Sequence, residues 1–248
     1  KIIVPRNVHK SVMTAIVMAD AIPVFIHPVL DERTGIAHGI TTPASAKALD
    51  EHPDAKAVLI INPTYYGIAA NLKQMVELAH SRQIPVLVDE AHGVHIHFHE
   101  QLPMSAMQAG ADMAATSMHK LGGSLTQSSI LNIQGPRVNP NRVQAILSML
   151  TTTSTSYLLL ASLDAARRYL ATQGHRLLSD TLTLAADARE QIAQIPGLYC
   201  IGPEILGSEA THAIDLTKLP ICVKDLGITG YEAEVCLREH YNIEVELS

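Results

Sequence analysis

Residues 84–100 read IPVLVDEAHGVHIHFHE, and this stretch decides which fold the sequence predicts. It opens with a short apolar run that ends at Asp89, a carboxylate. Residues 111–120 (ADMAATSMHK) repeat the arrangement, because a second apolar run leads there to Lys120. Short apolar runs bounded by turn residues are typical of buried strands, so the sequence predicts two strands that end in an acid and an amine.

Similar apolar runs alternate with helical patterns over the first half of the chain. Strands are predicted at residues 2–4, 22–26, 57–61, 86–89, 113–117 and 129–133. Helices are predicted between them, at residues 9–19, 43–51, 72–81 and 104–109. Such alternation, with runs of Val, Ile and Leu, predicts an α/β fold with a mainly parallel sheet between helices. Ligands bind at the carboxyl ends of the strands in such sheets, where Asp89 and Lys120 both fall.

The pattern changes after residue 138. A helix is predicted at 139–150, and a long helix at 157–195 that is interrupted near Gln173 and Gly174. Beyond it the sequence predicts one more helix at 230–240 and short strands at residues 198–201, 213–216, 221–223 and 243–247. The predicted organisation is a large domain, a connecting helical segment and a small α+β domain, at residues 1–156, 157–195 and 196–248.

The composition is that of a soluble globular chain, with 47% hydrophobic and 17% charged residues among 248. A net charge of −6 and the absence of Trp argue against a nucleic-acid partner. No apolar run is long enough to span a membrane. The three cysteines are too scattered for a disulfide framework, so we expect reduced thiols in a cytoplasmic protein. Because Lys1 enters a predicted strand directly, we expect the chain to be a piece of a longer protein.

An acid and an amine at neighbouring strand ends suggest a cofactor that needs both. Pyridoxal phosphate is such a cofactor, since a lysine forms its Schiff base and an acid keeps its ring nitrogen protonated. The glycines after Lys120 permit close approach of the backbone to a ligand, and Ser117, His119 and Ser124 can donate to a phosphate. A solvated lysine beside a glycine turn is the simpler alternative.

The alternating histidines His95, His97 and His99 would line one face of a strand. With His92, Asp89 and Glu90 they offer ligands that suit zinc or iron, so a metal-dependent hydrolase is an alternative function. We nevertheless predict no metal, because a polar, partly exposed segment explains the same pattern.

Two further motifs follow strands. His9 lies just after the first predicted strand, where it either caps the next helix or stacks on an aromatic ring. Residues 62–67 (NPTYYG) form a tight turn that directs Thr64 and the two tyrosines either toward a ligand or only into the turn.

Six motifs together carry a family resemblance: RNVHKS (6–11), NPTYYG (62–67), DEAHG (89–93), SMHK (117–120), ASLDAAR (161–167) and GITGYE (227–232). In this order they resemble the Orn/Lys/Arg decarboxylase family of fold-type I pyridoxal-phosphate enzymes, especially its shorter bacterial members. The resemblance runs over essentially the whole chain and implies an aminotransferase-like large domain with part of a small one.

The resemblance also implies roles for single residues. Lys120 would form the Schiff base with pyridoxal phosphate, Asp89 would hold the pyridine nitrogen, and His9 would stack on the ring. His92 would lie close to the cofactor. The implied phosphate contacts are Ser117 and His119, and His119 would also handle a proton near the α-carbon. Glu246 falls near the position of the family's acids that bind the substrate side chain.

The activity that the resemblance implies is decarboxylation of lysine, arginine or ornithine to the amine and carbon dioxide. A homodimer is also implied, in which residues 154–157 reach the neighbouring subunit's cofactor. Transamination or aldol cleavage on the same scaffold is the alternative. Arg238 is the only arginine after residue 189, which favours decarboxylation, since aminotransferases usually bind the substrate carboxylate with an arginine.

Overall fold

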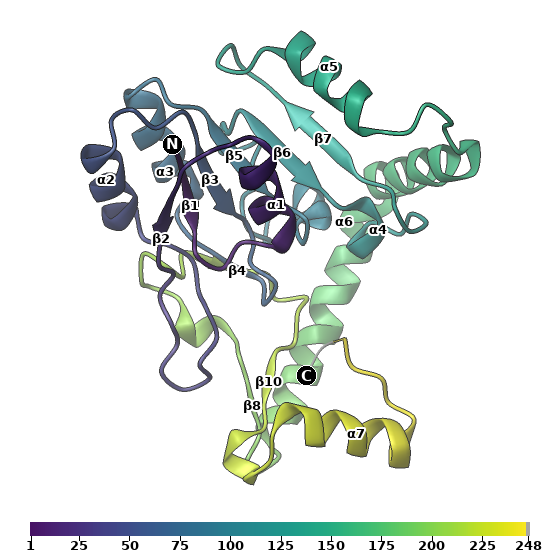
Figure 1. Ribbon diagram of the computed structural model, residues 1–248. Coiled ribbons are helices and arrows are strands. Elements are labelled where there is room, and N and C mark those ends of the chain that lie inside the picture. Colours follow the sequence, from purple (N-terminus) through teal and green to yellow (C-terminus); the bar gives the residue numbers. More distant parts are fainter. Residues whose placement is uncertain (247–248) are drawn as a thin grey trace.

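The computed structural model describes residues 1–246 and is built on one six-stranded sheet (Figure 1). Its strands, in spatial order, are β2 (Pro23–Ile26), β1 (Ile2–Pro5), β3 (Val58–Ile61), β5 (Val86–Asp89), β6 (Met113–Thr116) and β7 (Ile130–Ile133). All neighbouring pairs are parallel except β6 with β7, which is antiparallel. The predicted mainly parallel sheet is confirmed.

Helices cover both faces of this sheet. Alternate residues of β3 and β5, Val58 and Ile60 with Val86 and Val88, are at most 3% exposed and pack in one core with α2 (Thr42–Glu51) and α3 (Leu72–Ser81). The residues between them point to the opposite face, where α1 (Lys10–Met18) lies. Side chains that alternate along a strand thus face two helical layers, as a buried parallel sheet requires.

The predicted helix at 104–109 is wrong, because this segment forms turns. Its backbone groups are used by distant side chains: Glu90 accepts from the Ala106 N–H, and the Asn62 amide donates to the Met104 carbonyl. These bonds hold the segment in its turns, and a six-residue helix has little stability of its own with which to compete.

The predicted interruption of the long helix is also wrong. Helix α5 (Pro140–Leu150) is followed by α6 (Tyr157–Ala193), which is continuous over 37 residues. Gly174 is buried inside α6, and a Cβ atom there would lie 3.1 Å from the Cβ of Phe98. The glycine therefore gives close packing rather than a break, and this contact seats α6 on the 3₁₀ helix η1 (Val94–Phe98).

The remaining chain forms small elements. β8 (Tyr199–Cys200) pairs with β10 (Ile221–Cys222), and β9 (Ala213–Ile214) returns to pair with β4 (Ile68–Ala69). Three-residue 3₁₀ helices occur at η2 (Pro203–Ile205) and η3 (Lys224–Leu226). Helix α7 (Gly230–Tyr241) starts with a capping box between Thr229 and Glu232. Residues 243–246 of the predicted last strand are not in a strand, and Leu247 lies outside the described residues.

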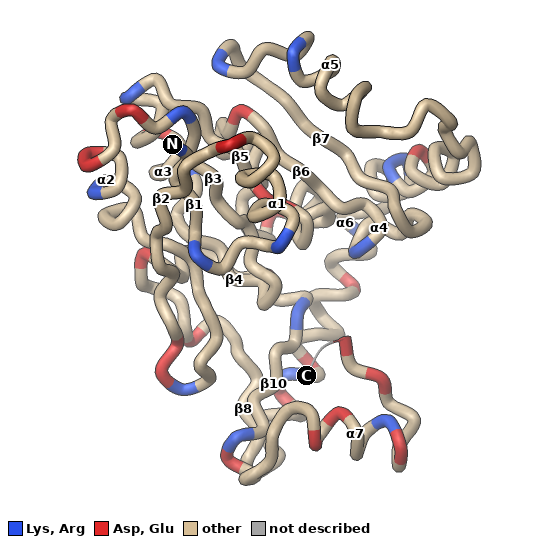
Figure 2. The backbone as a smooth tube through the Cα atoms, viewed as in Figure 1, with Lys and Arg blue, Asp and Glu red and all other residues tan. Residues whose placement is uncertain are grey.

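Charge is spread over the fold, with lysines and arginines interspersed among acidic residues (Figure 2). Within residues 1–246, no helix combines the length and the hydropathy that crossing a membrane requires. Recognition of a charged ligand therefore depends on local groups, such as those at the carboxyl edge of β5 and β6.

Candidate active site

Asp89 and Lys120 meet at the carboxyl edge of the sheet. Asp89 is the last residue of β5 and pairs in register with Ile61 and Ala115 of the flanking strands. One residue after β6, the chain enters the short helix α4 (Met118–Leu121), which carries Lys120. Because β5 and β6 are parallel neighbours, the carboxylate and the amine are brought to the same edge from distant parts of the sequence.

His92 lies between Lys120 and a tyrosine. The Lys120 Nζ atom lies 3.1 Å from the His92 Nε2 atom. On its other side, the His92 ring meets the ring of Tyr65 edge-on, with centroids 5.0 Å apart. Burial, together with the nearby charges of Lys120, Lys218 and His9, lowers the pKa of His92 to about 4. His92 is therefore neutral near pH 7, and its Nε2 atom accepts from the Lys120 ammonium.

The depressed pKa of His92 makes folding stability depend on pH. The unfolded chain takes up a proton at His92 near pH 6.5, whereas the folded chain does so only near pH 4. Stability from this group is complete above about pH 6.5 and decreases as the pH falls toward 4. In urea unfolding, wild type should lose more stability between pH 7 and pH 5 than His92→Gln. Equal losses in both proteins would contradict this assignment.

The other predicted residues surround the same edge. Ser117 occupies the N-cap of α4, yet its hydroxyl makes no capping bond, so it can serve a ligand. His119 donates from Nδ1 to the Ser128 carbonyl at 2.8 Å, which leaves its Nε2 atom for other work. Ser124 is buried and hydrogen-bonds with the Ser128 hydroxyl instead of facing the site.

His9 caps helix α1, as one of its two interpretations predicts. Its Nδ1 atom accepts from the backbone N–H of Ser11 at 3.2 Å and lies 2.9 Å from the Ser11 hydroxyl. The ring is exposed. Its charge contributes to the lowered pKa of His92, so His9 lies on the same side of the sheet as the site. Stacking on a cofactor ring stays a prediction.

The histidine run does not form a strand with one histidine face. It forms η1, and its members turn to three separate partners. His95 binds Asp215 at 2.7 Å, His97 binds Glu90 at 2.8 Å, and His99 lies 3.1 Å from the Ser179 hydroxyl. A 3₁₀ helix spreads residues i, i+2 and i+4 around its axis, which explains the divergence.

The roles of two of these partners were not predicted: Glu90 was considered only as a possible metal ligand, and Asp215 was not considered. Glu90 is completely buried and binds His97, the Ala106 N–H and Thr116. Asp215 is also completely buried; burial would raise the pKa of Asp215, but the hydrogen bond from His95 and those from Thr217 hold it below its usual value. Both carboxylates hold elements together, and nothing in their local sequence distinguishes them from solvated acids.

Lys218 is a further cation at this site that sequence analysis missed. It follows β9 and places its Nζ atom 5.6 Å from the centre of the Tyr65 ring. Burial lowers the pKa of Lys218, while Asp215 and Glu246 counteract this effect. Burial also raises the pKa of Tyr65, and the Glu246 carboxylate adds to the rise. Glu246 thus lies beside Tyr65, near the candidate active site. Its binding of the substrate side chain stays a prediction.

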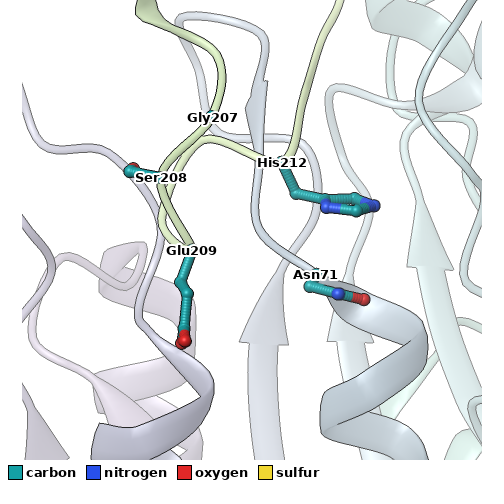
Figure 3. Close-up of a pocket in the computed structure, with 5 residues that line it drawn as sticks. All are labelled: Asn71, Gly207, Ser208, Glu209 and His212. Atoms are coloured by element: carbon teal, nitrogen blue, oxygen red, sulfur yellow. The ribbon is translucent and has the colours of Figure 1, made fainter.

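A polar hollow occurs elsewhere, at the start of helix α3 (Figure 3). It is lined by Asn71, Gly207, Ser208, Glu209 and His212. Asn71 uses its side-chain oxygen to cap α3 by accepting from the Gln74 N–H. None of the predicted site residues lines this hollow.

The residues at the carboxyl edge fit pyridoxal phosphate by their chemistry. Within residues 1–246 the side chain of Asp89 accepts one hydrogen bond, from the Ala91 N–H to Oδ1, so its second oxygen can accept from a ring nitrogen. Lys120 is exposed, and its Nζ atom lies against His92. Ala115, small and exposed beside Asp89, leaves the sheet surface open there. This cofactor needs a carboxylate for its ring nitrogen, an accessible amine, and hydroxyl or imidazole groups for its phosphate. The edge of the sheet offers all of them.

Comparison with known proteins identifies the family. The family model described as "Orn/Lys/Arg decarboxylase, major domain" matches residues 1–248. "Arginine decarboxylase" of Halalkalibacterium halodurans is 72% identical over 248 residues, which are all of this chain and 50% of that protein. "Arginine decarboxylase" of Bacillus subtilis is 66% identical and 51% covered. The chain spans about half the length of these relatives.

Solved structures agree with this fold. The structure of lysine decarboxylase A from Pseudomonas aeruginosa superposes with a TM-score of 0.84 over all of this chain and 41% of that one, at 20% identity. The constitutive lysine decarboxylase of Escherichia coli gives a TM-score of 0.79, again over all of this chain and 41% of that one, at 22% identity. The match of the family model over every residue, together with relatives of high identity, establishes that the chain belongs to the Orn/Lys/Arg decarboxylase family.

Proposed function

We propose that the protein to which this chain belongs removes the α-carboxyl group of a basic amino acid, with arginine as its substrate and pyridoxal phosphate as its cofactor. The observation that carries the proposal is the meeting of Asp89 and Lys120, with His92, at one edge of the sheet. The relatives at 66–72% identity that bear the name arginine decarboxylase favour arginine over lysine and ornithine.

When bound, pyridoxal phosphate supplies a ring that accepts the electrons released at the substrate's α-carbon. Asp89 would keep the ring nitrogen protonated, because its free carboxylate oxygen attracts that proton. Lys120 would hold the cofactor through its Nζ atom and yield to the substrate amine. The neutral His92 orients Lys120 by accepting from it at Nε2.

Loss of carbon dioxide leaves the α-carbon in need of one proton. Lys120, as an ammonium, or His119, through the Nε2 atom that Ser128 leaves free, would donate it. Ser117 and His119 would bind the cofactor phosphate, and His9 would lie against its ring. Glu246 would face the substrate guanidinium, supported by its position beside Tyr65.

Product analysis of the full-length protein with arginine, lysine and ornithine tests this function. We expect carbon dioxide and agmatine in equal amounts from arginine, with kcat/KM at least about ten times that for the other two, which equals about 1.4 kcal/mol of discrimination. An α-keto acid without carbon dioxide would indicate transamination. Activity that needs an added metal but no pyridoxal phosphate would support the hydrolase alternative.

We further infer that the protein acts as a homodimer. Five apolar side chains flank the polar run 151–156, and each is 52–82% exposed. They are Met149, Leu150, Tyr157, Leu158 and Leu160. Such a patch favours burial against a second copy. Leu158→Glu should shift the full-length dimer to monomer in light scattering. Leu184→Glu, at a leucine 69% exposed on the same helix, should stay dimeric. A dimeric Leu158→Glu protein would contradict the inference.

All three cysteines are free thiols, which supports the predicted cytoplasmic location.

A further inference from the structure

Lys218 places a second ammonium group at the candidate active site. Its Nζ atom lies over the ring of Tyr65, 5.6 Å from the centre. Tyr65 in turn meets His92, which accepts from Lys120. The charges of both lysines contribute to the lowered pKa of His92, so both are near it. A protein that binds a cationic substrate gains nothing from a second cation here unless that cation meets an anion.

The ammonium of Lys218 has no carboxylate bound to it. Among residues 1–246, Nζ takes part in no ion pair or hydrogen bond, and its recorded partner is the Tyr65 ring. The carboxylate of Asp215, three residues earlier, is committed to His95 and Thr217. Asp215 and Glu246 attract this half-buried ammonium without binding it, and an anionic ligand in direct contact would offset more of its burial cost.

Lys218 is held in place by a built framework. Asp215 and His95 form a buried pair, and Asp215 accepts from both the N–H and the hydroxyl of Thr217. The Lys218 N–H donates to the Asp215 carbonyl, and the Lys218 carbonyl accepts from Arg189 of α6 at 2.8 Å. Gly67 leaves room for the lysine stem, because a Cβ atom there would lie 3.0 Å from the Lys218 Cδ atom.

We infer that Lys218 binds the α-carboxylate of the amino-acid substrate, an inference that rests on the proposed function. A basic amino acid has a single anionic group, and its cationic end is repelled by Lys120 and Lys218. Glu246 is the acid beside Tyr65 that suits the cationic end. The cofactor phosphate is the other anion that such a site would bind. Its proposed contacts are Ser117 and His119 at the start of α4, which leaves Lys218 for the substrate carboxylate.

This role predicts which kinetic constant changes. The carboxylate carries its charge in the bound substrate and loses it as carbon dioxide leaves. Lys218 therefore stabilises the substrate complex at least as much as the transition state, and its removal raises KM without lowering kcat in proportion.

The test uses full-length holoenzyme with Lys218→Met. KM for arginine should rise about 10- to 100-fold, the range for losing a hydrogen bond to a charged group, and kcat should change less than about threefold. Inhibition by agmatine, which lacks the carboxylate, should be unchanged or tighter. Lys218→Arg should recover part of the affinity, and Lys224→Met, at an exposed lysine of η3, should behave as wild type.

Three results would overturn the inference. An unchanged KM for arginine would show that no carboxylate is bound, and equal weakening of arginine and agmatine would indicate a structural role. Loss of cofactor absorbance, with a normal KM once the cofactor is saturating, would assign Lys218 to the phosphate. Circular dichroism of both variants checks folding, and Lys218→Arg carries the test if Lys218→Met does not fold. A wild-type protein that releases no carbon dioxide would refute the proposed function itself.

Discussion

Lys120→Ala in the full-length protein should lose the visible absorbance of bound pyridoxal phosphate and reduce decarboxylation at least about a thousand-fold. The reason is that the other lysine near His92, Lys218, is directed elsewhere. Lys120 is exposed and lies 3.1 Å from the neutral His92, whereas the Nζ atom of Lys218 is directed to the Tyr65 ring. Absorbance spectra and release of labelled carbon dioxide measure both effects.

Borohydride reduction gives this experiment an independent readout. In wild type, reduction should attach the cofactor to the peptide that contains Lys120, which mass spectrometry can locate. Lys56→Ala, at an exposed lysine elsewhere in the chain, should retain both the attachment and the activity. If the Lys120→Ala protein still carried a reducible cofactor, another residue would hold it, and the proposed role of Lys120 would be wrong.

Glu90→Ala should destabilise the fold by about 2–4 kcal/mol, because it removes a completely buried carboxylate together with its hydrogen bonds. Glu90 is completely buried and accepts from His97 at 2.8 Å and from the Ala106 N–H at 2.6 Å. Its removal leaves the Ala106 N–H without its partner, takes the acceptor from the partly exposed His97 and opens a cavity. Denaturant unfolding of the two proteins, with the slope compared as well as the midpoint, gives the difference.

Two further variants test whether the effect depends on the charge of Glu90 and on its buried position. Glu90→Gln keeps an oxygen for the Ala106 N–H and should lose less stability than Glu90→Ala. Glu100→Ala removes an acid of the same segment whose side chain is 73% exposed, and it should unfold at the wild-type midpoint. A Glu90→Ala protein within about 1 kcal/mol of wild type would show that the site relaxes or admits water.

The sheet was predictable because its signals are local. The strand-forming runs that end at Asp89 and before Lys120 each carry their own pattern, and parallel neighbours must end at the same edge. The histidine run was harder, since alternation suits a strand while the chain there forms a 3₁₀ helix. Its shape is decided by hydrogen-bond partners outside the run, namely Glu90, Asp215 and Ser179.

Lys218 could not have been found in the same way. The contact that fixes its turn joins His95 to Asp215, residues that are far apart in sequence and meet only after β9 pairs with β4. Gly174 shows the opposite problem, because a glycine normally weakens a helix. In the folded protein its lack of a side chain lets Phe98 pack against α6, which no local pattern reveals.

The contact of Gly174 with Phe98 is only the first of several points that hold α6. The helix continues for about 28 Å beyond Gly174, at 1.5 Å per residue. Along this length Leu178 and Ala185 are buried, and Leu178 packs with Ile96 and Leu102. Near its far end Arg189 donates to the carbonyls of Lys218 and Ile201. One rigid helix therefore links the segment of the histidine run to the turn that carries Lys218, and fixes the distance between them.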